Sequence, residues 1–373
     1  MSIRGRVQAS IDLQAVQANF RKAKSLSGNS RMVAVVKANA YGHGLVPVAT
    51  ALDEADLFAV TDLNEALQLK AAAIEKPVLI LQGFIDRDEI PLIAASGFQL
   101  VLHSLEQLAV LDEALDASTL VQPLTCWLKM DTGMGRLGIP ARDYATTWRH
   151  LRSKPYINDV IMMTHLANTS LPGSALTTAQ LKDFNAVQHE LAAEGPATSI
   201  ASSAGILSDL GIQADWARPG IMLYGSSPFP WNISNLRASS LHLAAVMTLQ
   251  AKIIAIKDMN KGDNVGYCSQ FICPRPMRVG IVAIGYADGY PSNTPNGTPV
   301  LVRGKRCETI GRVSMDMLAV DLSEHPEACT GDVATLWGKD LAIDEIAAKT
   351  GILSYNLTCS ITRRVNFVYE RSE

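Results

Sequence analysis

Short runs of apolar residues recur along the first two thirds of the chain, and each is followed by polar residues and a segment with helical patterning. The runs span residues 33–36, 57–60, 78–81, 99–102, 124–129, 160–163, 198–201 and 215–217. Most are continuously apolar, which is typical of strands buried on both faces of a parallel sheet. Eight such units within about 230 residues predict an α/β fold with an N-terminal (β/α)8 TIM barrel. A doubly wound sheet is the weaker alternative, because no GxGxxG motif follows the first strand.

The pattern changes after residue 231. Residues 247–253 alternate between apolar and polar side chains, as a half-buried antiparallel strand does. Further strand-like runs follow at 278–284, 299–302, 306–310, 318–322 and 332–336, and only 343–349 is patterned as a helix, with a turn near Tyr355. We therefore predict a barrel over residues 1–236 and a mainly β C-terminal domain over 237–373. Residues 7–13 also alternate, so the first 13 residues are expected to pair with the second domain.

Composition narrows the functional classes. The 373 residues are 48% apolar and 18% charged, which is typical of a folded globular protein. A net charge of −3 offers no electrostatic case for nucleic acid or an anionic membrane as partner. With neither an apolar leader nor an apolar run of bilayer length, we expect a cytoplasmic protein. Six cysteines without CxxC spacing predict free thiols and no metal site.

Polar residues that could take part in catalysis or ligand binding follow several of the predicted strands. They are Lys37, Asp131, His165, Ser203 and Arg218. In a barrel, these positions lie on the C-terminal face, where active sites are built. Desolvation at the end of a buried strand would lower the pKa of Lys37 and make its amine nucleophilic. On residue type alone, however, a solvated lysine ends such a strand more often than a catalytic one.

Six segments in this order resemble the bacterial alanine racemase family of fold-type III pyridoxal 5'-phosphate (PLP) enzymes. They are residues 36–44, 129–138, 218–221 with 224–225, 265–267, 285–290 and 314–317. The resemblance runs essentially end to end and implies PLP as the cofactor and interconversion of L-alanine and D-alanine as the reaction. It also implies D-alanine biosynthesis for peptidoglycan precursors, or D-alanine catabolism as the other role.

The resemblance further implies two catalytic bases. Lys37 would bind PLP as an internal aldimine and act as one base, and Tyr267 would be the other. Racemisation needs a base on each face of a planar carbanion, and a lysine and a tyrosine from different domains meet that need. In this family Tyr267 and Met315 reach the cofactor of the other subunit, so the resemblance implies a homodimer with shared active sites.

The remaining site residues are also implied by the resemblance. Arg218 would donate to the pyridine nitrogen, and because a guanidinium accepts no proton, the ring would be a weaker electron sink that suppresses transamination and decarboxylation. The phosphate would be bound by Tyr41, Ser203, Gly220, Ile221 and Tyr355.

Arg136 would bind the phenolic oxygen and the substrate carboxylate, and Met315 and Asp316 would line the substrate pocket. His165 would lie at the cofactor, oriented toward Tyr267 and Arg218, with Tyr286 behind the site. Lys129, carbamylated in many family members, would brace Arg136.

Some features depart from the family pattern or leave other functions open. Ser202, Cys268 and the stretch 166–170 differ from the expected residues. A racemase for serine or a broader amino-acid set stays open, although crowded tyrosines favour a substrate side chain as small as methyl. A PLP amino-acid decarboxylase would need a carboxylate where this chain has Arg218. A non-catalytic PLP-binding barrel would lack the second domain and Tyr267.

Overall fold

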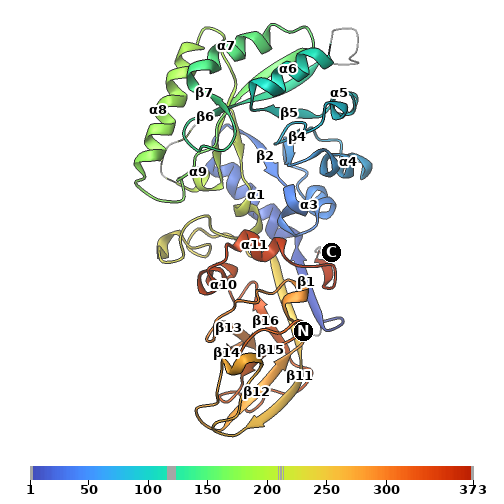
Figure 1. Cartoon of the computed structure of the whole chain (residues 1–373), viewed down its shortest axis with the longest axis vertical. Coiled ribbons are helices and arrows are strands. Elements are labelled where there is room, and N and C mark those ends of the chain that lie inside the picture. The colour runs from blue at the N-terminus through green and yellow to red at the C-terminus, as the bar shows by residue number, and fades with distance from the viewer. Residues whose placement is uncertain (1–2, 116–122, 209, 211, 213, 371–373) are drawn as a thin grey trace.

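The computed structural model describes residues 3–115, 123–208, 210, 212 and 214–370. The outermost residues of the two predicted domains, 1–2 and 371–373, lie outside this range. Figure 1 shows an elongated molecule with a parallel α/β part at one end and a mainly β part at the other. The predicted fold class is confirmed.

Eight parallel strands form the first part. They are β2 (Arg31–Val35), β3 (Leu57–Val60), β4 (Val78–Ile80), β5 (Gln99–Leu102), β6 (Leu124–Asp131), β8 (Ile157–Met163), β9 (Thr198–Ser202) and β10 (Trp216–Arg218). β5 pairs with β6 and β10 pairs with β2, so the sheet closes into a barrel. The two-residue strand β7 (Ile139–Pro140) is attached to the end of β6. All eight strand runs expected from the sequence are present.

Helices surround the barrel. They are α1 (Leu13–Leu26), α3 (Leu45–Ala51), α4 (Leu63–Ala71), α5 (Ile90–Ser96), α6 (Leu105–Ala114), α7 (Ala141–Arg152), α8 (Ala175–Glu190) and the short α9 (Ser203–Leu207). Short 3-10 helices are η1 (Arg87–Glu89), η2 (Ile221–Tyr224) and η3 (Ser234–Leu236). Asp62 caps α4 and Ser104 caps α6 by accepting backbone N–H groups, at 3.1 Å in each case. Each cap thus satisfies an N–H group that the first turn of the helix leaves without a backbone partner.

The barrel strands are apolar on both faces because each face meets a core. Residues such as Val33, Leu57 and Val101 point into the barrel, where Trp127 and Trp216 pack with ring centroids 5.4 Å apart. The alternate residues of the same strands belong to the larger core that packs under the helices. This double burial explains why the strand runs are continuous in the sequence.

The second part is a mainly antiparallel sheet. Its strands are β1 (Val7–Asp12), β11 (Met247–Met259), β12 (Met277–Val282), β13 (Pro299–Val302), β14 (Lys305–Ile310), β15 (Leu318–Asp321), β16 (Val333–Trp337) and β17 (Asn366–Glu370). The helices are α10 (Ile343–Thr350), α11 (Ser354–Cys359), η4 (Tyr267–Ser269) and η5 (Tyr286–Asp288). The sequence predicts no strand at β17, since most of this short strand is exposed or half-buried and shows little hydrophobic pattern.

The N-terminal strand joins the second sheet. β1 pairs antiparallel with β11, with Val7 opposite Ala251, and parallel with β17, with Gln8 opposite Asn366. The chain then enters the barrel through α1, whose first N–H groups donate to Asp12. The two parts are therefore linked by the crossing of β1 as well as by the chain between β10 and β11. The boundary between residues 236 and 237 stays a prediction.

Candidate active site

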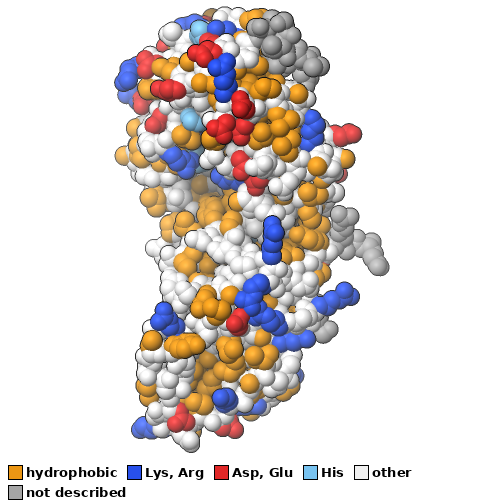
Figure 2. Space-filling view, turned by 45° about the vertical axis from the view of Figure 1, so that its right-hand side comes forward, with side chains coloured by type: hydrophobic (Ala, Val, Ile, Leu, Met, Phe, Trp, Pro, Cys, Tyr) orange, Lys and Arg blue, Asp and Glu red, His pale blue; other side chains and the backbone are white. Residues whose placement is uncertain are grey.

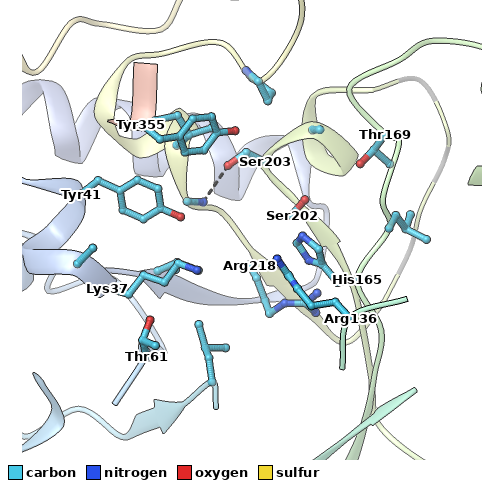
Figure 3. Close-up of a pocket in the computed structure, with 18 of the residues that line it drawn as sticks. Lys37, Tyr41, Thr61, Arg136, His165, Thr169, Ser202, Ser203, Arg218 and Tyr355 are labelled. Atoms are coloured by element: carbon cyan, nitrogen blue, oxygen red, sulfur yellow. Dashed lines mark hydrogen bonds between the residues drawn. The ribbon is translucent and has the colours of Figure 1, made fainter. Parts of the chain in front are cut away.

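A cavity of about 580 Å³ opens at the C-terminal ends of the barrel strands. Figure 3 shows side chains from the segment after β2, from the loops after β6 and β8, and from β9, β10 and α11 (Ser354–Cys359) converging on it. Ten of the residues predicted from the sequence line this cavity: Lys37, Tyr41, Lys129, Arg136, His165, Ser203, Arg218, Gly220, Ile221 and Tyr355. The strand ends thus bring together residues that lie far apart in the sequence.

The backbone immediately after Lys37 is left-handed. Ala38, Asn39, Ala40 and Tyr41 have φ angles of 53°, 54°, 53° and 52°, and they form the short element α2 (Lys37–Tyr41). A left-handed conformation costs about 1–2 kcal/mol for each residue with a Cβ. The turn begins at Ala38, four residues before the first glycine, Gly42. Surrounding contacts must therefore stabilise this turn.

Gly42 ends the turn against helix α11. It has a φ of 82°, and a Cβ at this position would lie 2.1 Å from the carbonyl oxygen of Thr358. Thr358 lies in the same helix as Tyr355 and Cys359, which both line the cavity. The close approach of Gly42 therefore positions the only cavity-lining helix that the second part contributes among the described residues.

Replacing Gly42 with alanine is expected to lower the free energy of unfolding by about 2–3 kcal/mol, because it combines an unfavourable φ with a backbone clash. The matched control is Gly28→Ala. Gly28 also has a positive φ, of 58°, but a Cβ there meets nothing within 4 Å, so a loss of only about 1 kcal/mol is expected. Urea unfolding of the two variants compares the effects. Equal losses would contradict the role assigned to the contact with Thr358.

The cavity is strongly cationic. Lys37, Lys129, Arg136 and Arg218 line it, and the described lining residues include no aspartate or glutamate. Burial lowers the pKa of Lys37, and the nearby Arg136 lowers it further. Burial, together with Arg218, Arg136 and Lys37, lowers the pKa of Lys129 to about 8. Such a site suits an anionic ligand that carries more than one negative group.

Arg218 is held by neighbouring strands. It is buried, and its Nη2 donates to the carbonyl oxygens of Thr164 at 2.6 Å and Ile200 at 3.2 Å. Its Nη1 donates to the Ser199 hydroxyl. Burial lowers the pKa of Arg218 to about 10, so the group stays protonated at neutral pH. Three fixed acceptors thus leave the guanidinium little rotational freedom where it faces the cavity.

His165 lies beside these cations, close to Arg136 and Arg218 in Figure 3. Burial lowers the pKa of His165 to about 3, and the positive charge of Arg218 contributes to the shift. The imidazole is therefore neutral at physiological pH. A neutral ring can stack or accept a hydrogen bond without adding to the repulsion among the cavity cations.

The hydroxyl of Ser203 organises one wall of the cavity. Its Oγ accepts the N–H groups of Gly220 at 2.8 Å and Met222 at 3.3 Å, and Figure 3 draws the first of these bonds. Because its oxygen already accepts two N–H groups, the Ser203 hydroxyl proton can be donated to an anion. A Cβ at Gly220 would lie 2.7 Å from the hydroxyl of Tyr41, so any larger residue here would displace that hydroxyl. Ile221 begins η2, where backbone N–H groups lack intrahelical partners.

Two tyrosines stand over this wall. Tyr41 stacks on Tyr224 with ring centroids 4.8 Å apart, and Tyr355 lies 6.0 Å from Tyr41. Burial raises the pKa of Tyr41 and raises that of Tyr355 to about 12. Both phenols therefore stay protonated and can donate to an anion. Tyr224 in turn packs on the buried His43, at 4.7 Å.

Four predicted site residues lie elsewhere in this chain. Tyr267, Tyr286, Met315 and Asp316 belong to the second part, and none of them is among the described residues that line the cavity. Tyr267 is 66% exposed and Met315 53% exposed. Figure 2 shows hydrophobic side chains on the surface of this part of the molecule. The cavity of one chain therefore lacks the four residues, from the second part, that were predicted for its opposite side.

Several residues that line the cavity or hold its cations have no role among the residues predicted from the sequence. Thr61, Gln82, Thr169, Ser202 and Cys359 line it without having been assigned a role. Thr61 directly follows β3 and Gln82 lies two residues after β4, so the position rule that selects Lys37 also selects them. By contrast, no local signal marks Thr164 or Ser199 as partners of Arg218, because those contacts arise across neighbouring strands.

The fold and the site together define a barrel enzyme of the PLP-dependent class, with a lysine at the end of its first barrel strand. A family model described as "Alanine racemase, N-terminal domain" matches residues 11–228, and "Alanine racemase, C-terminal domain" matches residues 246–369. The chain belongs to the alanine racemase family, and the resemblance noted in its sequence is confirmed.

Individual relatives support this assignment. The alanine racemase of Pseudomonas entomophila is 46% identical over 357 residues, covering 95% of this chain and 97% of the relative. The catabolic alanine racemase of Pseudomonas putida is 44% identical with the same coverage of both chains. Among solved structures, the biosynthetic alanine racemase from Pseudomonas aeruginosa has a TM-score of 0.91 at 40% identity and covers 100% of both chains. The structure of alanine racemase from Bartonella henselae with covalently bound pyridoxal phosphate has a TM-score of 0.87 at 27% identity, with coverage of 98% and 100%.

Proposed function

We propose that this chain interconverts L-alanine and D-alanine with PLP bound at Lys37. The observation that carries the proposal is the cavity of Lys37, whose lining holds four cations and no carboxylate among its described residues. The residues present fit PLP. Ser203, Tyr41 and Tyr355 offer hydroxyl donors for a phosphate, and Gly220 leaves room for it beside Tyr41. When bound, PLP withdraws electrons from the α-carbon of an attached amino acid and so makes its proton removable.

Residues of the chain would transfer the proton, bind the substrate carboxylate and hold the cofactor. Lys37 has a lowered pKa, so its amine can take and return a proton on one face of the α-carbon. Arg136 lies at the cavity on the loop after β6 and would bind the substrate carboxylate. Arg218 would donate to the pyridine nitrogen and keep it unprotonated. His165 would stay neutral beside Arg218, and Ile221 would present its N–H to the phosphate.

Tyr267 would be the second base, supplied by the partner subunit of a homodimer. This proposal is supported by the exposure of Tyr267, Tyr286 and Met315 on the second part of the chain, where apolar surface is available for burial. Asp316 lies beside Met315 and is held by Arg364 through Oδ1 at 2.5 Å. Met315 and Asp316 would border the substrate pocket of the partner, with Tyr286 behind them. A complete site would then need two copies of the chain.

The alternatives are less well supported. A PLP decarboxylase that protonates the ring nitrogen would need a carboxylate near Arg218, and no described cavity residue provides one. Whether the chain also racemises serine or a broader amino-acid set depends on the size of the substrate pocket. Relatives include both a catabolic and a biosynthetic alanine racemase, so both physiological roles remain compatible with the proposal.

Chiral chromatography of the products tests the proposal. The purified chain with added PLP is incubated separately with L-alanine, L-serine and L-lysine, and the D-enantiomer and carbon dioxide are measured. We expect D-alanine to form fastest and to approach an equal mixture of the two enantiomers. Release of carbon dioxide without inversion would overturn the racemase assignment, and faster inversion of serine or lysine would change the proposed substrate.

We further predict that Lys129 carries a carbamate. Its amine is buried and has a pKa of about 8, so a substantial neutral fraction is available near neutral pH to react with carbon dioxide. The product is an anion, which Arg136 and Arg218 would attract. Isotopically labelled bicarbonate should give a carbamate signal in the NMR spectrum that increases as the pH rises toward 8. The Lys129→Ala variant should lack the signal, and its absence from the wild-type protein would contradict the prediction.

Among the described helices, none has both the length and the apolar character that a bilayer crossing requires. The cytoplasmic location stays a prediction from composition. Fractionation of cells that express the full chain, with the D-alanine-forming activity followed in each fraction, would test it. Activity confined to a membrane or an external fraction would contradict the prediction.

A further inference from the structure

The left-handed turn after Lys37 joins two residues proposed to hold the cofactor. Lys37 precedes the turn and Tyr41 ends it, and the four residues 38–41 all have positive φ angles. Residues with a Cβ adopt this conformation only where neighbouring groups stabilise it. The groups that hold residues 38–41 therefore determine where the Lys37 amine and the Tyr41 hydroxyl lie.

Glu65 on α4 is the charged group that holds the turn. Its Oε1 accepts the N–H of Asn39 at 2.9 Å, and its Oε2 accepts the N–H of Thr61 at 3.1 Å. Asn39 follows β2 and Thr61 follows β3, so one carboxylate joins the ends of two neighbouring barrel strands. Hydrogen bonds to a charged acceptor are stronger than those between neutral groups.

Asn39 connects the turn to the start of α3 through two further hydrogen bonds. Its Oδ1 accepts the N–H of Leu45 at 2.8 Å, at the start of α3, and its carbonyl oxygen accepts the N–H of Gly44 at 2.9 Å. Asn39 is thus held by Glu65 on one side and attached to α3 on the other. A shift of Asn39 would move both Lys37 and Tyr41, each two residues away.

A comparison with Glu89 shows that the hydrogen bond to the Lys37 turn is particular to Glu65. Glu89 stands at the start of another barrel helix and accepts the N–H of Ile85, four residues before it, at 2.7 Å. Glu65 makes the equivalent bond to Thr61, also four residues before it. Glu89 makes its other bond to Asp86, within the same segment, at 3.4 Å, whereas Glu65 directs its other oxygen to the Lys37 turn.

We propose that Glu65 is a positioning residue that fixes the left-handed turn and thereby places Lys37 for the cofactor. The inference rests on the proposed PLP function of Lys37. Glu65 touches neither the cavity cations nor the reacting atoms in the described structure, so it acts through the backbone of Asn39. Its negative charge also raises the pKa of Lys37, against the larger lowering by burial and by Arg136.

Three variants test this role: Glu65→Ala, Glu65→Gln and the matched control Glu89→Ala. Hydrogen–deuterium exchange of the full chain without PLP reports on the amides of residues 39–45, and a PLP titration followed by absorbance gives the dissociation constant. We expect Glu65→Ala to speed exchange in this segment and to weaken PLP binding about tenfold to hundredfold, the range for losing one hydrogen bond to a charged group. Glu65→Gln keeps one acceptor and should fall between Glu65→Ala and the wild type.

Glu89→Ala should leave PLP binding and the exchange of residues 39–45 unchanged. In the Glu65 variants kcat should fall while KM for alanine stays the same, because the substrate carboxylate is bound elsewhere. Wild-type exchange and wild-type PLP affinity in Glu65→Ala would overturn the proposal, as would equal effects in Glu89→Ala. If the wild-type chain binds no PLP, the proposed function fails, but the exchange measurement still decides whether Glu65 holds the turn.

Discussion

Mixing two inactive variants, Lys37→Ala and Tyr267→Ala, should restore racemisation. Each variant alone loses one of the two bases, and loss of a general acid–base group lowers rates by about a hundredfold to ten-thousandfold. If each site combines Lys37 of one subunit with Tyr267 of its partner, a hybrid dimer contains one complete site and one doubly defective site. After random exchange, half of the dimers are hybrids, so about one quarter of all sites should be complete.

The experiment needs proof of exchange and a control for nonspecific effects. Native mass spectrometry of differently tagged subunits establishes that hybrids form. The matched control mixes Lys37→Ala with Arg218→Glu, because both substitutions lie on the barrel side of the site and no hybrid of these two contains an intact barrel. Restored activity in the first mixture only would support shared sites. Proven exchange without any restored activity would show that each site is built within one chain.

Replacing Arg218 with glutamate should slow racemisation by about a hundredfold or more, since a fixed cation at the reacting centre is lost. The substitution also removes the hydrogen bonds that Arg218 donates to the carbonyl oxygens of Thr164 and Ile200. A carboxylate opposite the pyridine nitrogen would favour its protonation and strengthen the electron sink. The remaining activity should therefore shift toward transamination. Chiral chromatography of alanine and an enzymatic assay of pyruvate measure both changes.

Arg218→Lys is the control for charge. Its ammonium group keeps a cation near the ring nitrogen, so pyruvate formation should not rise although racemisation slows. Unfolding curves and PLP binding show whether each variant is folded. If Arg218→Glu does not fold, Arg218→Gln, which adds no buried charge, replaces it and should also slow racemisation. A glutamate variant that folds and racemises at the wild-type rate, without extra pyruvate, would contradict the role proposed for Arg218.

Local patterning was sufficient for the fold class. The apolar runs at 57–60 and 99–102 coincide with β3 and β5, because burial on both faces removes polar residues from parallel strands. The strand pattern also predicts much of the cavity lining, since residues directly after parallel strands lie at the C-terminal face of the barrel. Lys37, His165 and Arg218 are among the residues that this rule selects.

Other features depended on contacts between distant segments. The left-handed backbone of Ala38 and Ala40 contradicts the ordinary preference of alanine and is stabilised by surrounding contacts that include the bond from Asn39 to Glu65. Likewise, Tyr355 reaches the barrel cavity from α11, which packs closely on Gly42. Neither arrangement leaves a periodic signal in the sequence.

The amino-acid sequence alone determined the barrel, the mainly β second domain and the family, together with Lys37 and the other polar residues that follow the strands. These follow from local burial patterns and from short segments whose order is recognisable. Only the tertiary structure decided how Arg218 is held, how Ser203 arranges Gly220 and Met222, and that Tyr267 is absent from the described lining of the cavity in its own chain. Those features depend on strand register and on packing between remote segments, which residue order specifies only through the folded chain as a whole.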